Sequence, residues 1–379
     1  MSGIYLHIPF CKQACHYCDF HFSTSIRRKE EMLNAMEREI QMRKDELSIA
    51  GQLKSKIQTI YFGGGTPSLL HPAEIERLVS LIEDNFEIDS DAEITLEVNP
   101  DDLESSRIIE LSKTPVNRLS VGIQSFRDED LKFMNRAHDR MQALSSLETA
   151  CNNFDNVSID LIYGVPGLSL EAWKANLNQA FEYPIQHISS YALTVEPKTA
   201  LDHFIRTGKC KAPDEDQARI HFEMLMEESA NQGFIHYEIS NFARAGYFSR
   251  HNTSYWQGKP YLGIGPSAHS YSGRRRSWNI ANNAKYLKGI ERGDPDRELE
   301  TLSETDRMNE MIMTGLRTIW GVSLNSFETE FGSQFAKQLI TRSDRFLCEG
   351  LLEVESGHLR ATKAGFFLID GIASDLFMV

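Results

Sequence analysis

Short apolar runs rich in β-forming residues alternate with runs of helical spacing over roughly the first 240 residues. The strand-like runs recur at intervals and occupy residues 4–8, 57–62, 93–98, 118–123, 157–162, 187–193 and 235–239. Between the first two, Met32, Met36, Ile40 and Leu47 lie near one face of a predicted helix. This alternation is typical of βαβ units that build a parallel sheet.

Six or seven such units are fewer than the eight of a closed barrel. We therefore predict an α/β fold, an incomplete (β/α)6-type parallel barrel, over residues 1–240. The alternation ends near residue 300. The pattern that follows predicts helices and a hairpin, an arrangement typical of a small winged-helix-like C-terminal domain at 300–379. Residues 241–299 are predicted to connect the two. In parallel barrels and open sheets, ligands bind at the carboxyl ends of the strands.

Three of the six cysteines, Cys11, Cys15 and Cys18, lie within eight residues directly after the first predicted strand. Thiolates this close on one loop can bind one inorganic centre, and a cubane iron–sulfur cluster held by three of them leaves its fourth iron open to a ligand. Zinc is the alternative, because His21 completes a Cys3His set. A disulfide is less favoured, since the other cysteines are scattered singly and no signal peptide is evident.

Polar residues follow several of the predicted strands. The loop Gly63-Gly64-Gly65-Thr66-Pro67 follows the second strand and lets backbone groups approach a ligand, although it has neither a Walker lysine nor GxGxxG spacing. The other members of this set are Glu97, Gln124, Arg136 and Asp160. Such a set suits a zwitterionic nucleoside ligand, with Arg136 for a carboxylate and the others for hydroxyls or an ammonium.

The composition excludes some classes of function. The formal charge of −14 over 379 residues argues against sequence-independent nucleic-acid binding. One basic run, Arg274-Arg275-Arg276, is either a solvated loop or a contact for propionates or phosphates. No apolar run is long enough to cross a bilayer, and Met1 leads straight into a strand, so we expect a soluble cytoplasmic protein.

Taken together, these motifs resemble the radical S-adenosylmethionine (SAM) family. The resemblance rests on the run from Tyr5 through His7-Ile8-Pro9-Phe10 to the three cysteines, on the Gly63–Pro67 loop, and on Val121-Gly122-Ile123-Gln124-Ser125-Phe126. It spans nearly the whole chain and is closest to the oxygen-independent coproporphyrinogen oxidases and their paralogues, the HemW haem chaperones. It also makes zinc a weak alternative.

The resemblance implies roles for individual residues. Cys11, Cys15 and Cys18 match the ligands of a [4Fe–4S] cluster. The positions that match SAM contacts are Tyr5 near the sulfonium, Tyr17 beside the adenine, Gly64, Gly65 and Thr66 at the methionine moiety, the side chains of Glu97, Gln124, Arg136 and Asp160, and the backbone of Ala192. For Asp160 and Ala192, plain packing and strand-end hydrogen bonding remain an equal alternative.

Three features resemble the chaperones more than the oxidases. Phe20 stands where the oxidases have a fourth cysteine, only ten residues precede Cys11, and residues 251–256 match the chaperones' HNxxYW motif. The resemblance implies that His251 ligates haem iron, with His269 as a secondary candidate. The expected function is haem delivery to apo-haemoproteins such as respiratory enzymes.

Two other functions stay open. The first is radical-SAM decarboxylation of coproporphyrinogen III as an oxidase, and the second, disfavoured by the charge, is iron–sulfur regulation through the C-terminal domain. The sequence also leaves open whether SAM is cleaved, whether the chain forms a homodimer, and whether it contacts a membrane peripherally.

Overall fold

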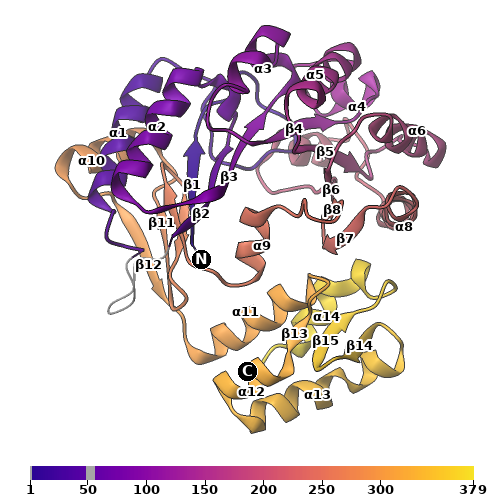
Figure 1. Cartoon of the computed structure of the whole chain (residues 1–379). Helices are drawn as coiled ribbons and strands as arrows, with labels where there is room; N and C mark the ends of the chain where they lie inside the picture. Colours follow the sequence, from indigo (N-terminus) through magenta and orange to yellow (C-terminus); the bar gives the residue numbers. More distant parts are fainter. Residues whose placement is uncertain (1, 48–55) are drawn as a thin grey trace.

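The computed structural model describes residues 2–47 and 56–379, and its central feature is a twelve-stranded sheet (Figure 1). Six strands pair in chain order and in parallel to form the middle of this sheet. They are β1 (Ser2–Ile8), β2 (Ile57–Gly64), β3 (Ile88–Val98), β4 (Arg118–Gln124), β5 (Val157–Tyr163) and β6 (His187–Ala192). The six predicted parallel strands are confirmed, with boundaries that differ mainly at the start of β3.

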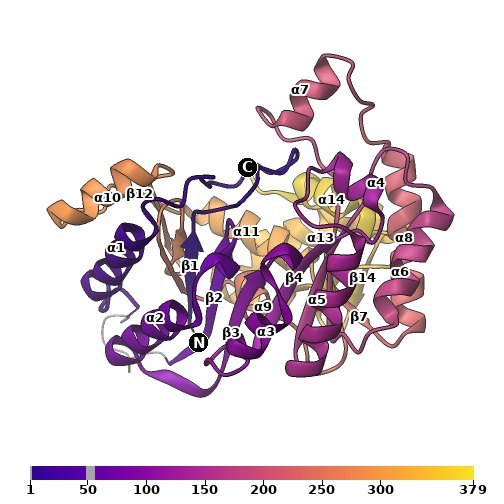
Figure 2. The same ribbon diagram turned by 90° about the horizontal axis from the view of Figure 1, so that it is seen from above.

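Helices from the crossover connections cover the outer face of the parallel strands (Figure 2). They are α1 (Lys29–Met42), α2 (Pro72–Asn85), α3 (Ser105–Leu111), α4 (Asp128–Phe133), α5 (Arg140–Asn153) and α6 (Leu170–Phe181). Met32, Met36 and Ile40 of α1 are buried as predicted, whereas Leu47 is buried beyond the end of the helix. The apolar stripes therefore form the core between the helices and the sheet.

The remaining strands extend both edges of the sheet. The run 235–239 forms β7 (Ile235–Glu238), which is antiparallel to β8 (Asn241–Ala243), and β8 pairs antiparallel with β6. At the other edge, β9 (Tyr261–Ile264) pairs in parallel with β1, and the hairpins β10 (His269–Tyr271), β11 (Arg275–Asn279) and β12 (Arg297–Thr301) follow. Residues 241–301, most of which were predicted to connect the two parts, thus supply strands β8 to β12 of the main sheet.

Four further helices belong to this part of the chain: α7 (Ala200–Arg206), α8 (Glu215–Asn231), α9 (Arg250–Trp256) and α10 (Asn283–Arg292). Helix α9 lies against the barrel side of β1 to β3. Its backbone N–H groups at Arg250 and His251 both donate to the Glu93 carboxylate at 3.1 Å, and a Cβ on Gly3 would lie 3.2 Å from the His251 ring. We call α9 the floor helix, because it closes the barrel at the end opposite the strand carboxyl termini.

The C-terminal unit has its own small sheet, in the order β13-β15-β14. Its elements are α11 (Glu304–Leu316), β13 (Val322–Ser323), α12 (Leu324–Phe331), α13 (Ser333–Cys348), β14 (Leu352–Glu355), β15 (His358–Ala361) and α14 (Ile369–Leu376). A 3₁₀ turn at Phe366–Leu368 precedes α14, and the Gly365 backbone next to it packs so closely on Leu351 O that no Cβ would fit. Across residues 2–47 and 56–379, no helix is both long enough and apolar enough to span a bilayer.

Candidate functional site

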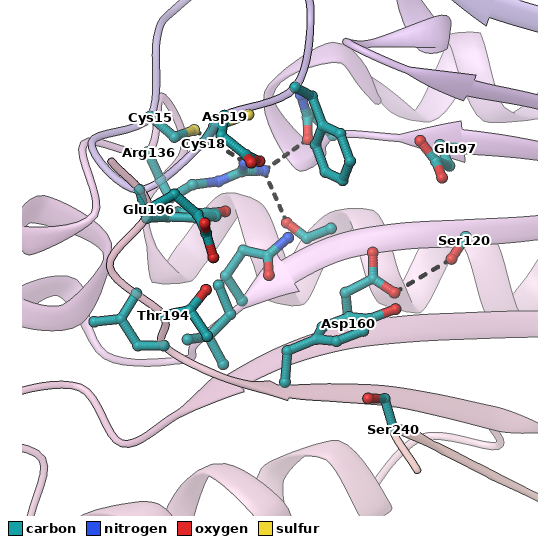
Figure 3. A pocket seen from close by; sticks show the side chains of 18 of the residues that line it. Cys15, Cys18, Asp19, Glu97, Ser120, Arg136, Asp160, Thr194, Glu196 and Ser240 are labelled. Carbon is teal, nitrogen blue, oxygen red and sulfur yellow. Dashed lines mark hydrogen bonds between the residues drawn. The ribbon is translucent and has the colours of Figure 1, made fainter. Parts of the chain in front are cut away.

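A cavity of about 680 Å³ opens at the carboxyl ends of the parallel strands. This volume falls in the range of roughly 300–1,000 Å³ that small-molecule sites occupy. Figure 3 shows Cys15, Cys18 and Arg136 gathered at one end and Glu97, Ser120 and Asp160 along the strands. Of the predicted site residues, the cavity brings together Cys11, Cys15, Cys18, Tyr17, Gly64, Gly65, Thr66, Glu97, Gln124, Arg136, Asp160 and Ala192.

The glycine loop holds the start of the cysteine loop through its backbone. Gly65 N donates to Ile8 O at 2.9 Å, and Thr66 N donates to Phe10 O at 2.7 Å. A Cβ on Gly65 would lie 2.6 Å from Phe10 O, so only glycine allows this approach. The glycine at this position thus serves the contact between the two loops, which sequence alone did not reveal.

Arg136 links the cysteine loop to the ends of β3 and β4. Its Nη2 donates to Asn99 Oδ1 at 2.6 Å and to Gly122 O at 3.0 Å, and its Nη1 lies 3.3 Å from Cys15 Sγ. Its buried Nε has no hydrogen-bond partner among the described residues. A buried guanidinium with an unused donor at the cavity wall is suited to a carboxylate ligand.

Two partly buried carboxyl groups, Glu97 and Asp160, line the cavity below the cysteine loop. Burial raises the pKa of Glu97 to about 7, although Tyr61 donates a 2.8 Å hydrogen bond to it. Burial likewise raises the pKa of Asp160 to about 6, against the opposing effect of the nearby Arg118. A cationic group of a ligand placed beside these carboxyls would lower both pKa values and be held by them.

Gln124 reaches the same wall through an uncommon backbone conformation, with φ at 63°. Non-glycine residues seldom adopt positive φ, and such strain is concentrated at functional sites. The residues at the site that sequence reasoning did not assign include Tyr61, Asn99, Gly122, Ser120, Asp19, Thr194 and Glu196. Asn99 is the most informative of them, because it joins Arg136 to Thr66, to which its Nδ2 donates at 3.0 Å.

Comparisons with known proteins agree with this geometry. The family profile described as "Radical SAM superfamily" matches residues 5–180, and that described as "HemN C-terminal domain" matches residues 302–368. A curated relative from Bacillus subtilis named "Heme chaperone HemW" is 36% identical over 88% of this chain and 87% of its own length. One of the same name from Lactococcus lactis is 33% identical over 97% of this chain and 95% of its own. The chain belongs to the HemW family of radical SAM proteins.

The fold of this HemW-family chain is also found among solved structures. The coproporphyrinogen III oxidase (HemN) from Escherichia coli, described as a radical SAM enzyme, superposes with a TM-score of 0.83 over 100% of this chain and 90% of its own, at 24% identity. This similarity confirms the predicted incomplete barrel with a C-terminal unit.

The cysteine loop fits the [4Fe–4S] cluster that the HemW family membership implies. The three thiols line the cavity from a single loop, whereas the zinc candidate His21 turns its Nε2 to Asn283 Oδ1 at 2.7 Å. Burial raises the pKa of Cys11, and that of Cys18 to about 11, so a bound centre would displace protons from these thiols.

Three residues that the resemblance assigned to ligand contacts do not line the cavity: Tyr5, His251 and the secondary candidate His269. Tyr5 lies beneath it, with its ring stacked on Tyr61 at 6.0 Å. His251, on the floor helix, is 1% exposed; its Nδ1 is 2.7 Å from Thr59 Oγ1, and its Nε2 is 2.7 Å from the Tyr255 hydroxyl. In this conformation neither ring nitrogen is open to haem iron, and ligation at Nε2 would require the bond to Tyr255 to break. Its ligand role stays a prediction.

We expect His251→Ala to destabilise this HemW-family fold by about 2–4 kcal/mol, because it removes two buried hydrogen bonds and leaves a cavity under β1 and β2. Chemical denaturation of the wild-type and variant chains measures this free energy of unfolding. His203→Ala, on the exposed surface of α7, is the matched control and should change nothing. An unchanged free energy for His251→Ala would show that the floor helix does not depend on this side chain.

Proposed function

We propose that this chain is a haem chaperone that carries a SAM-ligated [4Fe–4S] cluster and transfers haem to apo-haemoproteins. The observation that carries the proposal is the similarity, at 31–36% identity over most of the chain, to several relatives named haem chaperones. The proposed acceptors are apo-haemoproteins such as respiratory enzymes. The division of the chain into domains at 1–240, 241–299 and 300–379 stays a prediction. The cytoplasmic location of the protein also stays a prediction.

The residues of the cavity divide the proposed work between them. Cys11, Cys15 and Cys18 would hold the cluster, and Arg136 would bind the carboxylate of SAM while Asn99 keeps its guanidinium in place. When bound, a reduced cluster of this kind supplies the electron that cleaves a C–S bond of SAM. Glu97 and Asp160 would hold the cationic part of the ligand away from water.

The alternative function is oxidative decarboxylation of coproporphyrinogen III, which the shared fold with the oxidase allows. One residue favours the chaperone. Phe20, at the position of the oxidases' fourth cysteine, is 66% exposed at the mouth of the cavity. It offers an apolar surface there in place of a thiol.

The test of the proposal is haem transfer. Reconstituted full-length protein loaded with haem is mixed with an apo-haemoprotein, and the transfer is followed by the change in the Soret band. We expect stoichiometric loading and transfer faster than the release of haem to buffer. A chain that binds no haem, or that never passes it on, would overturn the proposal.

A second measurement separates the chaperone from the oxidase. With SAM and a reductant, we expect no conversion of coproporphyrinogen III to protoporphyrinogen IX, and Phe20→Cys tests whether a fourth cysteine alone introduces it. Chromatography of the porphyrins and of 5′-deoxyadenosine measures turnover. Multiple turnovers by the wild-type chain, with 5′-deoxyadenosine formed in proportion, would establish the alternative.

A further inference from the structure

The strands β10 and β11 carry an unusual group of side chains on the face turned away from α1. His269 pairs in register with Trp278, and Tyr271 pairs with Arg276, so these four side chains share one face. The opposite face is identified by Ser270, whose hydroxyl accepts a 2.9 Å hydrogen bond from Arg43 just after α1. We call the group His269, Tyr271, Arg276 and Trp278 the β10–β11 face.

His269 differs from His251 in every property that matters for binding a metal from solution. It is exposed, and no hydrogen bond joins its ring nitrogens to another described residue. Its ring stacks on Trp278, with centroids 5.8 Å apart and planes at 24°, which restricts the orientation of the imidazole. Burial and the nearby Arg276 lower the pKa of His269, which favours the neutral form that ligates metals.

The surroundings of His269 match the rest of a haem molecule. Tyr261 of β9 lies beside Tyr271, with ring centroids 6.3 Å apart, so the strands offer aromatic surface next to the imidazole. Arg274, in the turn between β10 and β11, is exposed and has no ion pair among the described residues, whereas Arg276 pairs with Glu310 of α11. A guanidinium that has no ion pair within the described chain suits a propionate carboxylate.

We propose that the β10–β11 face is the loading site for haem, with His269 as an axial ligand, the neighbouring tyrosines against the macrocycle and Arg274 of the adjoining turn near a propionate. The inference rests on the proposed function and adds to it the place and the ligand. Haem that is carried as cargo has to bind and leave quickly. The exposed imidazole of His269 allows haem to exchange with solvent while the barrel floor stays closed, whereas ligation by the buried His251 would require the floor helix to open.

The test is a haem titration of the cluster-reconstituted full chain. We expect His269→Ala to weaken haem binding at least about tenfold, a difference of about 1.4 kcal/mol. We also expect His269→Cys to bind haem with the shifted Soret band of a thiolate ligand. The matched control is His203→Ala, because His203 is also exposed and has no hydrogen bond to its ring among the described residues. It should bind haem as the wild-type chain does.

Each other outcome has a definite meaning. If His269→Ala keeps the wild-type affinity and spectrum, the inference is wrong while the chaperone function stands. If His203→Ala loses as much affinity as His269→Ala, haem binds surface imidazoles without preference, and the inference fails again. If the wild-type chain binds no haem at all, the proposed function fails together with the inference. Thermal melting of His269→Ala, expected to be unchanged for an exposed side chain, excludes misfolding as the cause of a loss.

Discussion

Cys15→Ser is expected to abolish the iron–sulfur cluster altogether. A three-thiolate cluster needs one thiolate on each of three irons, and Cys11 and Cys18 alone cannot complete that set. After anaerobic reconstitution the variant should have neither the broad visible absorbance nor the iron and sulfide of the wild-type chain. Cys15 lies in a loop outside the strands and helices, so the far-ultraviolet circular dichroism should stay the same.

The matched control for this experiment is Cys348→Ser. Cys348 is exposed at the end of α13 and does not line the cavity, so its loss should leave the cluster content unchanged. A wild-type chain that takes up one zinc and no iron or sulfide under reducing conditions would refute the cluster assignment. In that case the cysteine loop would be a structural metal site.

Arg136→Ala is expected to weaken SAM binding by about tenfold to a hundredfold, or about 1.4–2.7 kcal/mol. The reason is the loss of a guanidinium at the cavity wall, to which we assign the SAM carboxylate and whose buried Nε has no partner among the described residues. Calorimetry on the reconstituted protein measures the dissociation constant. The iron content has to be measured as well, because Arg136 also contacts Cys15 Sγ at 3.3 Å.

Two further variants make the Arg136 experiment specific. Arg136→Lys keeps the charge but cannot make several hydrogen bonds in the same plane, so it should recover only part of the affinity. Arg140→Ala removes an exposed arginine that donates to Gln179, and it should have no effect. An affinity of Arg136→Ala equal to that of the wild-type chain, at equal iron content, would move the carboxylate site elsewhere.

The parallel core could be predicted from the sequence because each of its strands is a local apolar run. The exception is the start of β3, where Asp89, Ser90 and Asp91 are polar and hide the extension of the strand back to Ile88. The strands β9 to β12 were not predicted, since they are three to five residues long and have no apolar periodicity. Their place is set by pairing between β1 and β9, which no local pattern can show.

The residues of the candidate site likewise divide into those that the sequence predicts and those that only the tertiary structure shows. The cysteines and the strand-end side chains form motifs that are contiguous in the chain or sit at predictable strand ends, and the structure brings them together around the cavity. The partners of Arg136 could not be predicted, because Asn99 and Gly122 meet it only across neighbouring strands. The burial of His251 likewise depends on Thr59, Gly3 and Glu93, which are far from it in the chain.

The pairing of β1 with β9 sets the order in which the chain can complete its fold during synthesis. Strands β1 to β6 can pair one after another as they leave the ribosome, but one edge of β1 has to wait for residues 258 positions later, such as Tyr261 for Gly3. At a synthesis rate of ~5–20 residues per second this takes roughly 13–52 s. The floor helix directly precedes β9, so the open edge and the open floor are closed almost together. Until then the cysteine loop is attached to a strand with an unpaired edge, which is a template for aggregation. The cavity can therefore receive its cofactors in a finished barrel only after most of the chain has been made.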